Sequence, residues 1–211
     1  MSSCLLSSIQ EKPMPLEIER KYLDVDFDAL RPRLAEFGKL LQPRHFERNL
    51  LFDSAGKTLL GKNQLLRLRR QQWRESSRCI LTFKAPVPTP AGFKVRDERE
   101  SAVEDFAGMA AILEGLGYMP LAEYQKVRES WDCSGVVVDL DIVPFARVVE
   151  LEGEPAQLEG VARLLGLDKY ESSTKTYHEL HRAWRRAQGL PMSASFVFGD
   201  EELETLLRDL G

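Results

Sequence analysis

The chain has 211 residues, with 29 Lys and Arg against 33 Asp and Glu, so its formal net charge is −4. This length is enough to bury a substantial core without disulfides or metals. Only 14 Gly and 11 Pro occur, too few for a fibrous or disordered chain. The slight negative charge gives no reason to expect nucleic-acid binding. The composition therefore predicts an ordinary globular protein with no nucleic-acid partner.

Cysteine content and hydropathy set the expected location. Cys4, Cys79 and Cys133 are odd in number and show no CxxC spacing, which excludes a disulfide framework and a zinc knuckle. No apolar run approaches the roughly 18 residues of a membrane span. Residues 1–13 lack the positive region of a signal peptide, and we interpret them as a loose leader. We expect reduced thiols, a cytoplasmic location and no membrane contact.

Short segments of alternating apolar and polar residues predict strands in chain order. They cover 16–23, 48–52, 65–70, 79–84, 93–104, 126–131, 136–142 and 147–152. Apolar residues at helical spacing predict helices over 28–37, 106–116, 155–165 and 177–188, and a last helix after Gly199. Residues 14–188 are predicted to form one domain, followed by a linker and C-terminal helix over 189–211.

Charged residues occupy alternate positions in these strands, so those of each strand share one face. The acids are Glu17, Glu19, Glu98, Glu100, Asp139, Asp141, Glu150 and Glu152, and the bases are Lys21, Arg67, Arg69, Lys84, Arg96, Lys126, Arg128 and Lys175. A half-exposed sheet with its polar face in water would explain each strand singly. A sheet closed into a barrel would instead place all of these charges around a lumen. Periodicity alone leaves both interpretations open.

A barrel lined with these charges would need internal ion pairs, water and a charged ligand, because unpaired buried charges cost several kcal/mol each. Eight bases suit a polyanion, and paired carboxylates suit a hard divalent cation that takes oxygen ligands. The pattern therefore indicates a metal–polyphosphate complex as the ligand.

Several segments in chain order resemble the motifs of one family. Residues 17–21 are similar to an ExExK motif, 66–69 to RxR, 81–84 to TxK, 96–100 to RxExE, 126–131 to KxRxxW, 139–141 and 150–153 to a late acidic pair of strands, and 175–180 to KSYxEL. This ordered set resembles the CYTH superfamily, the triphosphate tunnel metalloenzymes, from about residue 16 to residue 180.

The resemblance implies an α+β, mainly β fold: a closed eight-stranded antiparallel β-barrel that forms a tunnel, with helices packed outside. It also implies an enzyme that needs Mg²⁺ or Mn²⁺ and acts on a small-molecule triphosphate, as a monomer or homodimer. The implied metal ligands are Glu17, Glu19, Glu150 and Glu152, with Asp139 or Asp141. The predicted triphosphate ligands are Lys21, Arg67, Arg69, Lys84, Arg96, Lys126, Arg128 and Lys175. The predicted catalytic set is Glu17, Glu19, Lys21, Glu98, Glu100 and Lys175.

Two segments depart from the family pattern. Residues 142–146 lack the usual Gly-containing turn, which leaves open whether Asp139 or Asp141 faces the site. Residues 13–16 stand where class IV adenylyl cyclases often carry a His-Phe pair. We therefore favour hydrolysis of inorganic triphosphate or a small organic triphosphate such as thiamine triphosphate. The alternatives are a class IV adenylyl cyclase that makes cyclic AMP and pyrophosphate, and a non-catalytic module that binds polyphosphate or a nucleotide.

Overall fold

The computed structural model describes residues 18–87 and 96–211, as nine strands and six helices. The strands are β1 (Ile18–Leu23), β2 (Lys39–Ser54), β3 (Leu65–Gln72), β4 (Ser77–Pro86), β5 (Arg96–Val103), β6 (Tyr118–Cys133), β7 (Val136–Val143), β8 (Ala146–Gly153) and β9 (Ser172–Ser173). The helices are α1 (Phe27–Phe37), α2 (Thr58–Gly61), α3 (Phe106–Gly115), α4 (Pro155–Leu165), α5 (Tyr177–Ala187) and α6 (Asp200–Arg208).

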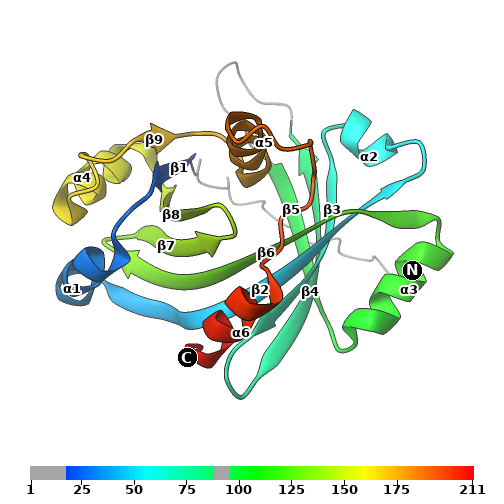
Figure 1. Ribbon diagram of the computed structural model, residues 1–211, viewed down its shortest axis with the longest axis horizontal. Coiled ribbons are helices and arrows are strands. Elements are labelled where there is room, and N and C mark those ends of the chain that lie inside the picture. The colour runs from blue at the N-terminus through cyan, green and yellow to red at the C-terminus, as the bar shows by residue number, and fades with distance from the viewer. Residues whose placement is uncertain (1–17, 88–95) are drawn as a thin grey trace, which may run out of the picture.

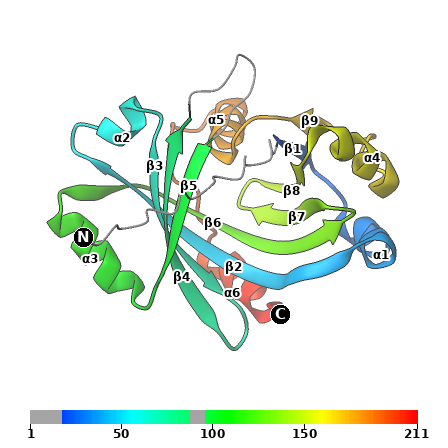
Figure 2. The same ribbon diagram turned by 180° about the vertical axis from the view of Figure 1, so that it is seen from behind.

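All nine strands belong to one antiparallel sheet in the order β5-β4-β3-β2-β6-β7-β8-β1-β9. The long strands β2 and β6 lie at its centre and cross the molecule (Figure 1). Strands β7, β8 and β1 lie on one side of this central pair, and β3, β4 and β5 lie on the other, as the view from behind also shows (Figure 2). The α+β, mainly β class is therefore confirmed.

The predicted closed eight-stranded barrel is not what the described residues form. The sheet has nine strands and is open, because β5 pairs only with β4 and β9 pairs only with β1 in the described part of the chain. The physical reason lies in the edge strand β9, which has two residues and two register partners on β1. A strand this short does not offer the ladder of backbone groups that closure onto β5 would need.

Strands β2 and β6 are much longer than the short strands predicted within them, at 16 residues each. They pair along most of their length, with register shifts at Leu40/Gln42, Gln42/His45 and Leu51/Phe52. A bulge shifts the residues that follow it to the opposite phase, so the alternation in the sequence is interrupted. The sequence pattern detected only residues 48–52 of β2 and 126–131 of β6, in the second half of each strand.

Helices cover one face of the sheet and leave the other face to the charged residues. The main core joins α1 and α4 to apolar residues of β1, β6, β7 and β8. Leu34 of α1 and Leu158 of α4 belong to this core, as do Val138 of β7 and Leu151 of β8. A second cluster packs α3 on β2 and β3 through Leu113, Phe52 and Leu68. We call this helix-covered side the outer face and the opposite side the inner face.

The predicted helices 28–37, 106–116, 155–165 and 177–188 agree with the structure to within one residue at each end, and capping groups fix several of these ends. The Asp105 side chain accepts the Ala107 N–H at 2.9 Å, and Gly166 ends α4 with φ of 69°, a conformation that favours glycine. Thr176 and Glu179 form a capping box at the start of α5. This box fixes the direction in which the first residue of α5, Tyr177, leaves the loop.

The C-terminal helix α6 packs on the outer face of the sheet. Leu203, Leu206, Leu207 and Leu210 contact a cluster that contains Phe46 and Val127. The predicted division into 14–188 and 189–211 stays a prediction, and the predicted leader 1–13 lies outside the described residues. Among the described helices, none has the length and apolar character needed to cross a membrane.

Truncation of Leu34 tests the main core. Leu34 is fully buried between α1 and the sheet, so Leu34→Ala should lower the free energy of unfolding by about 2–5 kcal/mol. Leu60 is 61% exposed, and Leu60→Ala should change the free energy of unfolding by less than about 0.5 kcal/mol. Urea unfolding measures both. Equal effects of the two variants would contradict this description of the core.

Candidate functional site

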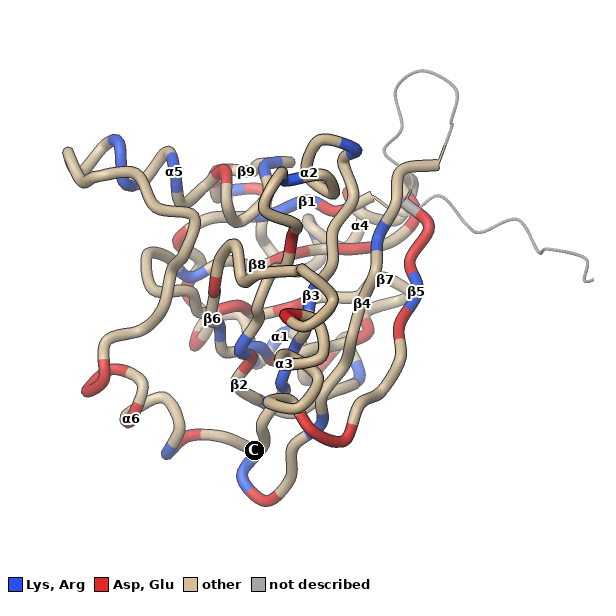
Figure 3. The backbone as a smooth tube through the Cα atoms, turned by 90° about the vertical axis from the view of Figure 1, so that its right-hand side faces the viewer, with Lys and Arg blue, Asp and Glu red and all other residues tan. Residues whose placement is uncertain are grey.

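Charged side chains from eight strands, β1 to β8, gather on the inner face of the sheet. Figure 3 shows Lys and Arg interleaved with Asp and Glu along the strands. The described members with ion pairs on this face are Glu19, Lys21, Glu47, Arg67, Arg69, Lys84, Glu98, Glu100, Lys126, Arg128, Asp139, Asp141 and Glu150. We call this set the inner charge network.

Arg128 on β6 is the centre of the acidic half of the inner charge network. Its Nε donates to Asp141 Oδ1 at 2.7 Å, and its Nη2 lies 2.6 Å from Asp141 Oδ2 and 2.9 Å from Glu150 Oε2. Its Nη1 also pairs with Asp139. Asp139 and Asp141 both face Arg128, which resolves the question of register that the sequence left open.

Lys21 on β1 holds the neighbouring part of the network. Its side chain is 2% exposed, and its Nζ donates to Glu150 and to Glu19, at 2.9 Å in each case. Lys21 lies directly opposite Glu150 in the β1–β8 register, and Glu19 lies opposite Glu152. The alternation of β1 therefore places Glu19 and Lys21 beside the acids of β8.

A second group lies on β3, β4 and β5. The Arg67 Nη2 donates to the Thr82 hydroxyl at 3.2 Å, which in turn donates to Glu100 Oε1 at 2.7 Å. Lys84 Nζ lies 2.6 Å from Glu98, in a more exposed position. Glu98 and Glu100 thus orient basic residues.

Two tyrosines that the sequence analysis missed complete the lining. The hydroxyl of Tyr177, from the first turn of α5, donates to Asp141 at 2.5 Å, and Lys21 and Lys126 lie over its ring. The Tyr124 hydroxyl accepts from Arg67 at 3.4 Å. Tyr177 stands two residues after the predicted Lys175. Tyr124 is in phase with the predicted Lys126, so the alternation of β6 could have revealed Tyr124.

Glu47 and its neighbours on β2 were also missed. His45, Glu47 and Asn49 alternate as the predicted residues do and are all fully buried. The predicted strand began only at residue 48, so this alternation was not recognised. Glu47 contacts Arg69 at 3.1 Å and Lys126 at 3.6 Å, and Asn49 accepts from Arg69 at 2.7 Å.

The pKa values of the network follow from burial and pairing. Burial alone would raise the pKa of Glu150, but Arg128, Lys21 and Lys126 outweigh it and hold this pKa well below its usual range. Burial would lower the pKa of Lys21, yet Glu150 and Glu19 raise it. Burial, together with Asp141 and Glu150, raises the pKa of Tyr177 well above its usual range. Lys21 therefore stays charged, and Tyr177 stays a hydrogen-bond donor.

Comparison with known proteins now identifies the family. The family model of the CYTH domain matches residues 15–177, most of the chain. The chain belongs to the CYTH family. CYTH proteins are generally triphosphatases or adenylyl cyclases that depend on a divalent metal. A search of curated proteins finds no match to this sequence.

Solved structures share the fold at low sequence identity. A candidate adenylate cyclase from Vibrio parahaemolyticus superposes with a TM-score of 0.62 and 18% identity, covering 79% of this chain and 98% of its own. The PH1819 protein from Pyrococcus horikoshii gives 0.62 and 21%, covering 78% and 97%. The candidate adenylyl cyclase HpAC1 from Hippeastrum, described as having a dominant triphosphatase activity, gives 0.59 and 21%, covering 84% and 97%.

Four predicted site residues lie outside the inner charge network as described. Glu152 is exposed on β8, opposite Glu19. Lys175 is exposed in the loop before α5, and its side chain has no ion pair with another described residue. Glu17 lies outside the described residues, and so does the side chain of Arg96, although Arg96 begins β5.

The acidic residues have the donor chemistry for the metal that the CYTH family implies. Carboxylate oxygens suit Mg²⁺ and Mn²⁺. The Asp139 Oδ1 atom is buried without a hydrogen-bond partner, and Glu19 and Glu152 are neighbours on adjacent strands. The oxygens of Asp141 and Glu150 are occupied by Arg128, Lys21, Lys126 and Tyr177. Within 18–87 and 96–211, no three His, Cys, Asp or Glu already lie close enough together to hold an ion. Glu19, Glu152 and Asp139 therefore have the donor chemistry for a metal, while they do not form a preassembled site in the described part of the chain.

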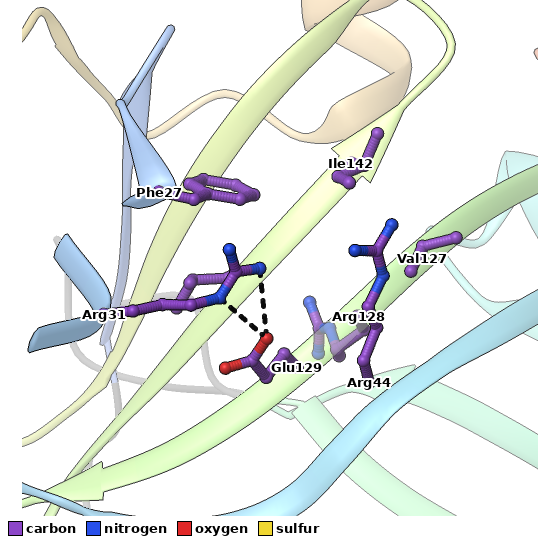
Figure 4. A pocket seen from close by; sticks show the side chains of 8 residues that line it. Phe27, Arg31, Arg44, Val127, Arg128, Glu129 and Ile142 are labelled. Atoms are coloured by element: carbon purple, nitrogen blue, oxygen red, sulfur yellow. Dashed lines mark hydrogen bonds and ion pairs between the residues drawn. The ribbon is translucent and has the colours of Figure 1, made fainter. Parts of the chain in front are cut away.

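A separate shallow depression lies on the outer face beside α1 (Figure 4). Phe27 and Ile142 line it, together with an ion pair in which Arg31 Nη2 donates to Glu129 at 3.2 Å. Glu129 alternates with Arg128 along β6 and so points to the other side of the sheet. Arg128 is the one member of the inner charge network among the described residues that line this depression, so we place the candidate site on the inner face.

Acid unfolding tests the pairing of Glu150. A carboxyl whose folded pKa is depressed contributes stability above its unfolded pKa of 4.5 and loses it as the pH falls toward the folded pKa. Glu150→Gln should therefore reduce the slope of unfolding free energy against pH by up to about 1.4 kcal/mol per unit below about pH 4. Urea unfolding in EDTA at several pH values measures this slope. An unchanged slope would show that Glu150 is not held ionised.

Proposed function

We propose that this CYTH protein hydrolyses a triphosphate, inorganic or attached to a small organic group, with Mg²⁺ or Mn²⁺. The observation that carries the proposal is that basic and acidic side chains lie side by side on the inner face. Basic residues converge from β3, β4 and β6, and carboxylates converge from β1, β7 and β8. A polyphosphate chain carrying a divalent cation needs both kinds of group side by side.

On this proposal the basic residues bind the phosphate chain. Arg67, Arg69, Lys84 and Lys126 offer N–H donors to the phosphate oxygens and neutralise their charge. Arginine fits this role because its planar guanidinium matches two phosphate oxygens at once. Most of these side chains are already held by carboxylates and hydroxyls, so they lose little freedom when the substrate binds.

The acidic residues have a different part in the reaction. Glu19, Glu152 and Asp139 would hold the divalent cation, which supplies Lewis-acid neutralisation of the developing charge. Lys21 and Tyr177 stay protonated and orient Glu150 and Asp141 by hydrogen bonds. In hydrolysis, a water oxygen bonds to the terminal phosphorus and the P–O–P bond breaks, releasing phosphate and the diphosphate-bearing product.

Product analysis tests the reaction. The purified protein is incubated with Mg²⁺ or Mn²⁺ and, separately, with inorganic triphosphate, thiamine triphosphate and ATP, and products are separated by ion exchange. Release of phosphate from a triphosphate supports the proposal. Cyclic AMP and pyrophosphate from ATP would instead identify a cyclase. Triphosphate binding without any product would identify a binding module.

Two neutral variants test the assignment of metal ligands. Glu19→Gln and Glu152→Gln should each lower kcat by about 100-fold or more, because they remove charge from the cation site. Affinity for inorganic triphosphate in EDTA, measured by calorimetry, should change by less than about 3-fold, since the phosphate ligands remain.

The matched control for these two variants is Glu159→Gln, which removes an exposed carboxylate from α4. Glu159→Gln should leave both kcat and the affinity for inorganic triphosphate unchanged. Full turnover in both Glu19→Gln and Glu152→Gln would show that these residues do not hold the metal.

A further inference from the structure

Glu47 is a fully buried carboxylate at the centre of the sheet, with 0% exposure. It lies on β2, where it is paired with Gln71 of β3 on one side and with Lys126 of β6 on the other. No family motif quoted above includes it. Its position between two strands that carry basic residues gives it neighbours on both sides.

The two carboxylate oxygens of Glu47 face different partners. Oε1 accepts from Gln71 Nε2 at 2.8 Å and lies 3.1 Å from Arg69 Nη1. Oε2 lies 3.6 Å from Lys126 Nζ and is buried without a hydrogen-bond partner among the described residues. One carboxylate thus contacts two cations of the inner charge network that come from different strands.

A further layer of contacts fixes Glu47 in this orientation. The side-chain oxygen Oε1 of Gln71 accepts from Arg78 Nε at 2.6 Å. The side-chain nitrogen Nε2 of Gln71 is therefore directed at Glu47 and lies 3.1 Å from His45 Nε2. His45 Nδ1 lies 2.9 Å from the Pro43 carbonyl and therefore carries the proton. The His45 ring also stacks on Trp73 at 4.8 Å. Glu47 consequently has no room to turn toward a ligand.

The energetic cost of this arrangement implies a purpose other than stability. Burying a carboxylate is expensive, and a buried ion pair is often no more stabilising than apolar residues of the same volume. A charged anchor does, however, hold two cations in place and reduce their mutual repulsion. Without Glu47, Lys126 would keep Asp141, 3.2 Å away, as its only ionic partner among residues 18–87 and 96–211.

We propose that Glu47 is a positioning residue that fixes the Arg69 guanidinium and the Lys126 ammonium for binding to phosphate oxygens. It acts through these two side chains and does not touch the substrate. The inference rests on the proposed function, because it takes Arg69 and Lys126 as phosphate ligands. It adds a role for β2, a strand that contributes none of the predicted ligands.

Glu47→Gln tests the proposal, because it keeps the shape of the side chain and removes its charge. For inorganic triphosphate, we expect the Kd in EDTA and the KM with Mg²⁺ to rise by at least about 10-fold. The kcat should change by less than about 3-fold, since the metal-binding acids are unaltered. A purely structural role would lower the melting temperature without this separation of KM from kcat.

The matched control is Glu123→Gln. Glu123 is also a paired carboxylate on a central strand, held by Arg48 through two contacts of 2.9 Å, but it faces away from the inner charge network. This variant should leave Kd, KM and kcat unchanged. If Glu47→Gln also leaves Kd, KM and kcat unchanged, the positioning role is overturned.

A double-mutant cycle tests whether Glu47 acts through Lys126. The Kd for triphosphate is measured for Lys126→Met with and without Glu47→Gln. The effect of Glu47→Gln should be smaller in the Lys126→Met background, because one of its two routes is already lost. Equal factors in both backgrounds would overturn the proposal.

A second variant covers the case in which Glu47→Gln does not fold. Gln71→Leu removes the amide that orients Glu47 but keeps every charge, and it should raise KM in the same direction by a smaller factor. An unchanged KM in folded Gln71→Leu would overturn the positioning role. A wild-type protein that neither binds nor hydrolyses any triphosphate would instead refute the proposed function, and with it this inference.

Discussion

The ion pairs of Arg128 with Asp139, Asp141 and Glu150 are the interaction on which the inner face depends. Three carboxylates from two neighbouring strands lie together there, each at most 7% exposed at the side chain. Without a cation among them they would repel one another and take up protons. Arg128 holds the pKa values of Asp141 and Glu150 below their usual range, whereas burial raises the pKa of Asp139 despite its pairing with Arg128. Lys21 and Lys126 extend the same compensation to β1 and β2. The open, curved sheet can therefore have one face covered by helices and the other lined with charge.

The same compensation links stability to function. Networks of this kind are weak evidence for stability, because desolvation offsets much of the Coulomb attraction. Their value here lies in holding groups of both signs in fixed places before any ligand arrives. Tyr177 contributes from α5, and Glu47 contributes from β2, so the preorganised region reaches beyond the strands that carry the family motifs.

Much of this arrangement could be predicted from the sequence, and the exceptions have physical causes. Alternation placed Lys21, Arg128, Asp139, Asp141 and Glu150 on one face correctly, because strand geometry dictates it. It missed Glu47, because the charged Arg48 stands between the polar residues Glu47 and Asn49, so this part of β2 shows no clean apolar–polar alternation. It missed Tyr177, because a helix and its capping box bring this side chain to the sheet, and no strand pattern records that contact. Whether the sheet closes depends on edge pairing between segments far apart in the chain, and the two-residue β9 left it open.

The most direct test of this account is the melting temperature of the protein in EDTA with and without inorganic triphosphate, at matched ionic strength. If the inner charge network binds the phosphate chain, the ligand stabilises the folded state by about 2.7 kcal/mol at 100 times its Kd, and the melting temperature rises accordingly. The rise should largely disappear in Arg69→Gln and persist in Glu123→Gln. No rise in the wild-type protein, or an equal rise in Arg69→Gln, would contradict the assignment of the inner face as the triphosphate site.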